Sequence, residues 1–137
     1  MNRTELQQLA ELRINEAGIL LANRAWDGAY YLAGYAVECA LKACIAKQTL
    51  AEEFPDKKQA ERAWKHDFNE LVAVAGIESD LKAEILRSQP FKENWNTVRQ
   101  WSEQSRYRRI SQSECEKLFA AMIDAFTGVL PWIKLRW

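Results

Sequence analysis

Apolar residues recur every three or four positions along most of this chain, which is the period of an amphipathic α-helix. The pattern is longest over residues 26–47, which contain no proline and only four charged side chains. One face of this stretch is apolar or small: Tyr30, Ala33, Val37, Ala40, Leu41 and Cys44. The other faces carry small residues that let neighbouring helices approach closely. We therefore expect the central helix of a bundle here, with Asp27 as its N-cap and an ion pair between Glu38 and Lys42.

The N-terminal pattern predicts a long helix over residues 4–23 that packs antiparallel to the central one. Its leucines and alanines form one stripe, and Thr4 followed by Gln7 is a capping-box sequence. Residues 48–64 are polar, charged and interrupted by Pro55. We expect a mobile loop there, with room for a turn of helix.

The C-terminal half predicts shorter helices. We expect them over residues 67–76, 79–88, 90–103 and 111–131. Gly76 is a natural left-handed stop, Pro90 stands where a first-turn proline belongs, and Pro131 ends or kinks the last helix. No stretch alternates in the way that predicts a strand. Together the patterns predict an all-α fold, an up-and-down bundle of four to five helices in a single domain over residues 1–137.

The composition fits one globular domain, because 48% of the 137 residues are apolar and 28% are charged. The formal net charge is zero, so no whole-molecule field draws the protein towards nucleic acid or an anionic membrane. The central helix carries interior charges and the N-terminus has no apolar signal core, so we expect no membrane association and a cytoplasmic location. The cysteines, Cys39, Cys44 and Cys115, lie on apolar faces, and we expect them to be buried, reduced thiols.

Histidine chemistry is limited, because His66 is the only histidine. A di-iron bundle needs two Glu-x-x-His pairs, and a zinc site needs ligand spacings that His66 and the cysteines lack. No glycine-rich phosphate loop occurs either. We therefore expect no metal and no cofactor. The sequence leaves two interpretations of His66 open: a helix-start residue that hydrogen-bonds locally, or a polar group at the mouth of the loop 48–64.

A basic and aromatic segment covers residues 92–109. Five basic residues stand there against two glutamates, so its net charge is +3 while the rest of the chain is −3. Aromatic side chains interleave with the basic ones, a mixture typical of surfaces that hold nucleotides or single-stranded RNA. The candidate ligand-binding residues are Arg99, Trp101, Arg106, Tyr107, Arg108 and Arg109. The alternative is that these arginines follow a helix C-terminus, favour its dipole and are otherwise solvated.

Three strings of the sequence resemble one family. LAGYAVECALKACIA, then KHDFNEL, and then W-x5-Y within WSEQSRY are similar to HEPN domains, small prokaryotic helical domains that occur alone or beside nucleotidyltransferases. The strings follow the family's order and cover roughly residues 15–110. The resemblance implies a helical homodimer. Arg106 and Tyr107 stand where non-nuclease members of the family carry an arginine–tyrosine pair.

Active HEPN ribonucleases are marked by an arginine followed, after four to six residues, by a histidine at the homodimer cleft. There the arginine positions phosphate, and the histidine serves in acid–base attack by the RNA 2′-hydroxyl. This sequence lacks the motif, because no histidine follows the arginines of residues 92–109 and only three residues separate Arg62 from His66. The nuclease chemistry of the family is therefore not carried over to this chain.

Two function classes stay open. The resemblance and the missing motif favour a non-catalytic helical module that forms a homodimer and binds a nucleotide, RNA or a partner protein, such as a nucleotidyltransferase encoded beside it. The alternative is a divergent, metal-independent HEPN ribonuclease, for example of a toxin–antitoxin or defence system, with His66, Arg106 and Tyr107 as its catalytic candidates. Trp132 and Trp137, in the apolar tail PWIKLRW, suggest a partner surface.

Overall fold

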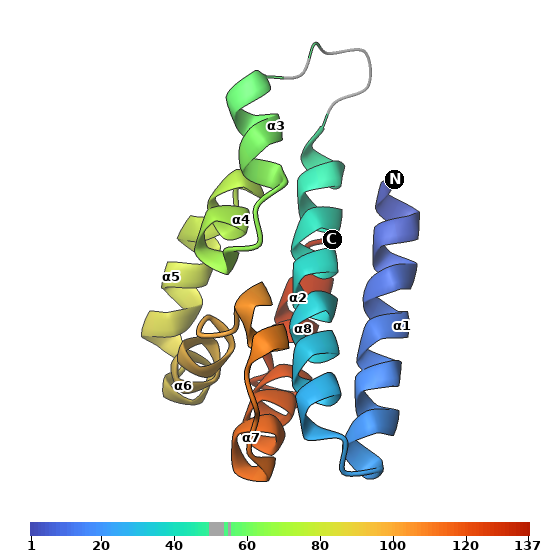
Figure 1. Ribbon diagram of the computed structural model, residues 1–137. Helices are drawn as coiled ribbons and strands as arrows, with labels where there is room; N and C mark the ends of the chain where they lie inside the picture. Colours follow the sequence, from blue (N-terminus) through green and yellow to red (C-terminus); the bar gives the residue numbers. More distant parts are fainter. Residues whose placement is uncertain (50–53, 55) are drawn as a thin grey trace.

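The computed structural model describes residues 1–49, 54 and 56–137, which form helices joined by turns, with no strand among them (Figure 1). The elements are α1 (Arg3–Ala22), α2 (Trp26–Gln48), α3 (Lys57–Ala63), α4 (Phe68–Val74), α5 (Glu78–Arg87), α6 (Gln89–Val98), the 3₁₀ helix η1 (Glu103–Tyr107), α7 (Gln112–Ile123) and α8 (Val129–Lys134). The all-α prediction is confirmed. The described residues form eight α-helices rather than four or five, because the helix predicted over residues 111–131 is divided in two, the predicted loop contains a helix, and the short helices are separate elements. None of these helices is long and apolar enough to cross a membrane.

The two long helices, α1 and α2, lie side by side, and α4, α5 and α6 lie on the other side of α2 (Figure 1). α2 is the central helix, since η1, α7 and α8 contact it as well. Its small residues allow this close packing: Ala36, Ala40 and Ala43 are fully buried. A Cβ at Gly34 would lie 1.9–2.1 Å from ring atoms of Trp101, so only glycine admits the indole at this position. The central-helix prediction is thus confirmed.

The N-cap of α1 is Asn2, two residues before the predicted cap Thr4. The Asn2 side chain accepts from the backbone N–H of Glu5 at 2.9 Å, and the Glu5 carboxylate accepts from the backbone N–H of Asn2 at 2.8 Å. This reciprocal pair is a capping box. The prediction of a box from Thr4 to Gln7 is therefore wrong, because asparagine caps at least as well as threonine and stands ahead of it.

α2 begins after Ala25, whose side chain caps no backbone group. Asp27 was the predicted cap, but its carboxylate is used elsewhere. It accepts from the backbone N–H of Ile110 at 2.7 Å and pairs with Arg109 Nε at 2.9 Å. The N-cap prediction is wrong, and Asp27 instead ties the segment after η1 to the start of α2.

The polar stretch 48–64 contains α3, a helix of seven residues, where the sequence predicted a loop with a turn. The helix forms because Asp56 is its N-cap and accepts from the backbone N–H of Lys58 at 2.8 Å. The prediction of a mobile loop concerns residues 50–53 and 55, which lie outside the described residues.

Three helix ends agree with the prediction. Asp67 caps α4 by accepting from the backbone N–H of Glu70 at 3.0 Å. Gly76 follows α4 with a φ of +70°, a left-handed conformation that side chains other than glycine rarely adopt. Pro90 lies in the first turn of α6. These capping residues carry local signals, which is why the sequence identified them.

The helix predicted over residues 90–103 ends at Val98 as α6, and the chain turns before η1. After this turn the Trp101 side chain lies in the core, where it is only 3% exposed. Its ring stacks on Phe68 with 5.3 Å between centroids, and its Nε1 donates to the backbone oxygen of Tyr30 at 3.2 Å. Trp101, a candidate ligand-binding residue, is thus mainly a core residue, although it also lines a depression beside His66.

The helix predicted over residues 111–131 is divided into α7 and α8. Asp124 accepts from the backbone N–H groups of Phe126 and Thr127 at 3.0 and 2.8 Å, and this turn interrupts the helix. Helical spacing places Phe126 on an inward face, but it is 95% exposed, so that expectation is wrong. Pro131 lies in the first turn of α8 rather than at a helix end.

The core confirms the prediction of buried cysteines, since all three are buried and free. Burial raises the pKa of the Cys44 and Cys115 thiols to about 11, so both stay protonated near neutral pH. Trp132 is also buried, between the Phe91 ring and the Arg136 guanidinium. It belongs to the core rather than to the partner surface that the sequence suggested.

Candidate functional site

Four polar side chains of α2 share one face of the helix. They recur at spacings of four, three and four residues, which places them along one side. They are Tyr31, Tyr35, Glu38 and Lys42, and we call them the α2 polar stripe. The stripe contacts His66, just before α4, and Arg106 of η1. These two residues are separated by forty positions in the sequence, and α2 brings them to one surface.

Glu38 is a buried carboxylate with a partner for each oxygen, and it is only 3% exposed. One oxygen accepts from Lys42 Nζ at 2.8 Å, which confirms the predicted ion pair. The other lies 2.9 Å from His66 Nδ1. Because a buried carboxylate is costly without partners, these two contacts hold the lysine and the histidine in defined positions.

His66 thus hydrogen-bonds across the fold, to a residue 28 positions earlier, and the interpretation as a locally bonded helix-start residue is wrong. Its side chain is 39% exposed. Nδ1 is engaged by Glu38, and within the described part of the chain no residue bonds to Nε2. A carboxylate that fixes one ring nitrogen and leaves the other for a ligand is the arrangement in which histidines transfer protons.

Tyr31 and Tyr35 connect His66 to Arg106. Their hydroxyl oxygens are 3.4 Å apart, and Tyr35 packs edge-on against the His66 ring with 6.2 Å between centroids. Burial, followed by the hydrogen bond with Tyr31, raises the pKa of the Tyr35 hydroxyl well above its usual range. Tyr35 is therefore neutral near pH 7 and acts as an uncharged hydrogen-bonding group.

Arg106 is the exposed cation beside the stripe. Interaction with the hydroxyls of Tyr31 and Tyr107 raises the pKa of this guanidinium. The guanidinium also lies over the Tyr107 ring, 4.8 Å from the centroid. Among the described residues no carboxylate pairs with Arg106. It therefore presents an uncompensated positive charge from a supported position.

The neighbouring arginines are occupied. Arg108 makes a bidentate contact with Glu114, at 3.0 and 2.7 Å. Arg109 pairs with Asp27, and Arg99 donates to a side-chain oxygen one turn earlier at 3.2 Å. Within residues 92–109, which the structure describes in full, Arg108 and Arg109 are thus neutralised by carboxylates, whereas Arg99 and Arg106 contact only neutral groups. Of these two, Arg106 lines a depression and Arg99 does not.

Two depressions open beside the α2 polar stripe. The Arg106 depression has a volume of about 330 Å³ and is lined by Arg106, Tyr107 and their neighbours, together with Tyr31, Gly28 and the Arg109-paired Asp27 of α2. The His66 depression has a volume of about 510 Å³ and is lined by His66, its neighbours and the segment around Glu103. Both volumes are in the range of small-molecule sites, roughly 300–1,000 Å³. η1 contributes residues to both depressions: Glu103 to the His66 depression, and Arg106 and Tyr107 to the other.

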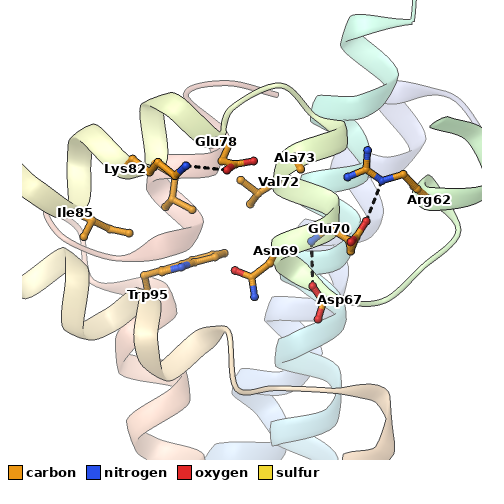
Figure 2. Close-up of a pocket in the computed structure, with 11 residues that line it drawn as sticks. Arg62, Asp67, Asn69, Glu70, Val72, Ala73, Glu78, Lys82, Ile85 and Trp95 are labelled. Carbon is orange, nitrogen blue, oxygen red and sulfur yellow. Dashed lines mark hydrogen bonds and ion pairs between the residues drawn. The ribbon is translucent and has the colours of Figure 1, made fainter. Parts of the chain in front are cut away.

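A third depression of about 550 Å³ lies between α4, α5 and α6 (Figure 2). Its charged rim is already neutralised, because Arg62 pairs with Glu70 and Lys82 pairs with Glu78, each at 2.9 Å (Figure 2). Trp95, which the sequence placed among the aromatic residues of the basic segment, lies along this depression. Unlike His66, none of its lining residues hydrogen-bonds to the α2 polar stripe, so we place the candidate site elsewhere.

Three features of the site were not predicted: the contact between Glu38 and His66, the tyrosine pair, and Trp64, an exposed tryptophan that lines the His66 depression. The spacing of Tyr31, Tyr35 and Glu38 is visible in the sequence and is a signal for a polar face. The contact between α2 and His66 joins distant segments and has no local signal. Trp64 stands in a stretch without apolar periodicity, so no pattern marks it.

In residues 1–49, 54 and 56–137, no group of three or more His, Cys, Asp or Glu side chains is placed to hold a metal ion. Searches against protein-family models, curated proteins and solved structures found no significant match for this chain. The chemistry of the two depressions is therefore the basis for assigning a function.

Proposed function

We propose that this protein is a non-catalytic, HEPN-like helical module that binds the phosphate of a nucleotide or of RNA in the Arg106 depression. The proposal rests on the surroundings of the Arg106 side chain. Its guanidinium is exposed, lies over the Tyr107 ring and interacts with the Tyr31 hydroxyl, and no carboxylate among the described residues neutralises it. The other arginines of the segment are held by side chains of the protein itself.

Phosphate recognition by Arg106 has a physical basis. A guanidinium presents planar donors that match phosphate oxygens, and hydrogen bonds between charged partners are stronger than neutral ones. Support from Tyr31 and Tyr107 reduces the side-chain entropy that Arg106 loses on binding. Tyr107 is itself exposed beside the guanidinium, so its ring offers a stacking surface for a base.

We also propose the homodimer that the resemblance implies, and contact with a partner such as a nucleotidyltransferase. Support comes from large apolar side chains that this chain leaves in solvent: Leu12, Ile19, Leu86, Phe126 and Leu135. Burial of such side chains against a second chain removes apolar area from water, which is the main driving force of association.

The Glu38–His66 pair supports a second candidate, the divergent ribonuclease. His66 Nε2 would accept the proton of an RNA 2′-hydroxyl, whose oxygen attacks the adjacent phosphorus and displaces the 5′-oxygen. Arg106 and Tyr107 would contact the phosphate, and Glu38 would stabilise the protonated imidazole. We place this candidate second, because the contacts that link His66 to Arg106 run through both tyrosines of the stripe rather than directly.

Titration with a short single-stranded RNA tests the proposal. Arg106→Ala should weaken binding by about 1–3 kcal/mol, the contribution of one charge-assisted contact. Arg99→Ala is the matched control, because it removes an equal charge from the same segment outside both depressions, and it should bind as the parent does. Equal affinities of the parent and Arg106→Ala would contradict the proposal.

Analysis of the same RNA for cleavage products separates the two candidates. If the protein is a binding module, neither the parent nor His66→Ala cleaves the RNA. If it is a ribonuclease, the parent cleaves the RNA and His66→Ala is slower by at least ~100-fold, the usual contribution of a general acid or base.

A further inference from the structure

We propose that the His66 depression is a base-recognition pocket, in which a nucleobase stacks on Trp64 and its exocyclic amino group donates to the Glu103 carboxylate. The site would thus prefer bases that carry an amino group, such as cytosine, to uracil. This inference rests on the proposed function, since it adds a base pocket to the phosphate site at Arg106.

The first observation is the position of Trp64. It is the C-cap residue of α3, and its side chain is 81% exposed. A single exposed aromatic residue is common on protein surfaces and carries no signal alone. Trp64, however, lines a depression of about 510 Å³ together with His66. An exposed indole at the rim of a concave polar site is a stacking surface, and stacking tolerates any planar base.

The second observation is the set of polar groups around the same depression. The Asp67 carboxylate caps α4, and the Ser102 hydroxyl oxygen accepts from the backbone N–H of Gln104 at 3.2 Å. By contrast, the Glu103 carboxylate and the Lys65 ammonium have no hydrogen-bond or ion-pair partner among the described residues. The pocket therefore combines the free Glu103 carboxylate, the free Lys65 ammonium and the unbonded His66 Nε2 with an exposed aromatic ring.

These groups match the edge of an amino-bearing base. A carboxylate accepts from the amino group at C4 of cytosine, whereas uracil presents a carbonyl oxygen at that position and repels it. Lys65 supplies a donor for a ring carbonyl of the same base. Of the ligands that Trp64 alone would accept, Glu103 selects those with a donor on the base edge.

The geometry of η1 connects this pocket to the phosphate site. Glu103 begins η1 and lines the His66 depression, whereas Arg106 lies three residues on and lines the other depression. A 3₁₀ helix rises about 2.0 Å per residue, so the two side chains are offset by about 6 Å along its axis. That offset is of the order of one nucleoside, which allows one nucleotide to occupy both depressions.

Nucleosides test the pocket without the phosphate site, because they carry no phosphate. We expect cytidine to shift the indole N–H signal of Trp64 in NMR spectra and to bind about tenfold more tightly than uridine, as one hydrogen bond to a charged acceptor provides. Trp64→Ala should weaken both nucleosides by at least about fivefold. Arg106→Ala should leave both affinities unchanged.

Glu103→Gln is the specific variant. A glutamine amide donates to the uracil carbonyl as readily as it accepts from the cytosine amino group, so the preference for cytidine should disappear. Glu93→Gln, an equal change on the exposed face of α6, should keep the preference. The pocket is disproved if neither nucleoside shifts the Trp64 signal at millimolar concentration, or if the preference survives in Glu103→Gln. If the parent protein prefers cytidine but binds no phosphate, only the function proposed for Arg106 is contradicted.

Discussion

At the scale of single residues, Glu38 shows how a buried charge organises a surface. Its carboxylate is removed from water, and its two oxygens fix one lysine and one histidine at the same time. Buried ion pairs add little net stability, because desolvation offsets much of the attraction. Their effect is instead to define the position of their partners. In this protein the partner that gains a defined position is His66, at the mouth of a depression.

Gly34 allows the other contact on which the site depends, the approach of Trp101 to α2. We predict that Gly34→Ala destabilises the protein by about 1–3 kcal/mol through overpacking. An added Cβ would lie 1.9–2.1 Å from the indole, which the stack on Phe68 holds in place. The cost of this steric overlap should exceed the stabilisation of about 1 kcal/mol that alanine gives relative to glycine in a helix interior. Chemical denaturation measures the change in unfolding free energy.

Gly18→Ala is the matched control for this prediction. An added Cβ at Gly18 would lie 3.5 Å from the Phe119 ring, an ordinary contact, so the helix-propensity term should dominate. We expect this variant to be more stable by about 0.5–1 kcal/mol. A Gly34→Ala protein as stable as Gly18→Ala would show that the indole can move away from α2.

At the scale of elements, the long helices were predictable and the breaks were not. The pattern of residues 26–47 is unbroken over six turns, and α2 has nearly the predicted bounds. The spacing of Trp95, Val98 and Trp101 is equally helical, yet the chain leaves the helix after Val98. Periodicity records that these side chains are buried, not how the chain buries them. The space for the Trp101 ring exists because Gly34, some seventy residues earlier, has no side chain, and no local pattern reveals this contact.

η1 is a short element, and we attribute its position to Asp27 of α2. Asp27→Ala should leave the backbone N–H of Ile110 without a partner, at a cost of about 1 kcal/mol in unfolding free energy. We expect faster hydrogen exchange at Ile110 and weaker phosphate binding, because Arg106 is carried by the element that Asp27 anchors.

Asp27→Asn is the conservative variant for this test. The asparagine oxygen still accepts from the Ile110 N–H but no longer pairs with Arg109. It should therefore keep slow exchange at Ile110, since surface ion pairs contribute little. Equal exchange rates in Asp27→Ala and the parent would show that η1 is held by other contacts.

At the scale of the whole molecule, the candidate site was predictable in part. The sequence placed Arg106 and Tyr107 among six candidates because basic and aromatic residues gather in one segment, and the resemblance to HEPN domains singled out this pair. It could not separate Arg106 from Arg108 and Arg109, since their partners come from α7 and α2. Nor could the sequence predict the hydrogen bond between His66 and Glu38, because that contact forms only when α2 and α4 pack together. Composition predicts which groups are present, and tertiary structure decides which of them remain free.

The net charge of zero has a related consequence for ligand binding. Two of the five cations of the basic segment, Arg108 and Arg109, are compensated by carboxylates from other elements, which reduces the positive surface that could attract nucleic acid. Binding therefore depends on one supported arginine and on the fit of the ligand beside it.

The most direct test of this account follows the Arg106 side chain itself during titration with 5′-CMP. NMR detection of the arginine Nε–H signals reports each guanidinium separately. We predict that 5′-CMP shifts the Arg106 signal and the backbone amides of η1, and that cytidine, which lacks the phosphate, leaves the Arg106 signal in place. An unchanged Arg106 signal under saturating 5′-CMP, or shifts confined to Arg62 and Lys82 at the third depression, would contradict the claim that Arg106 is the phosphate anchor.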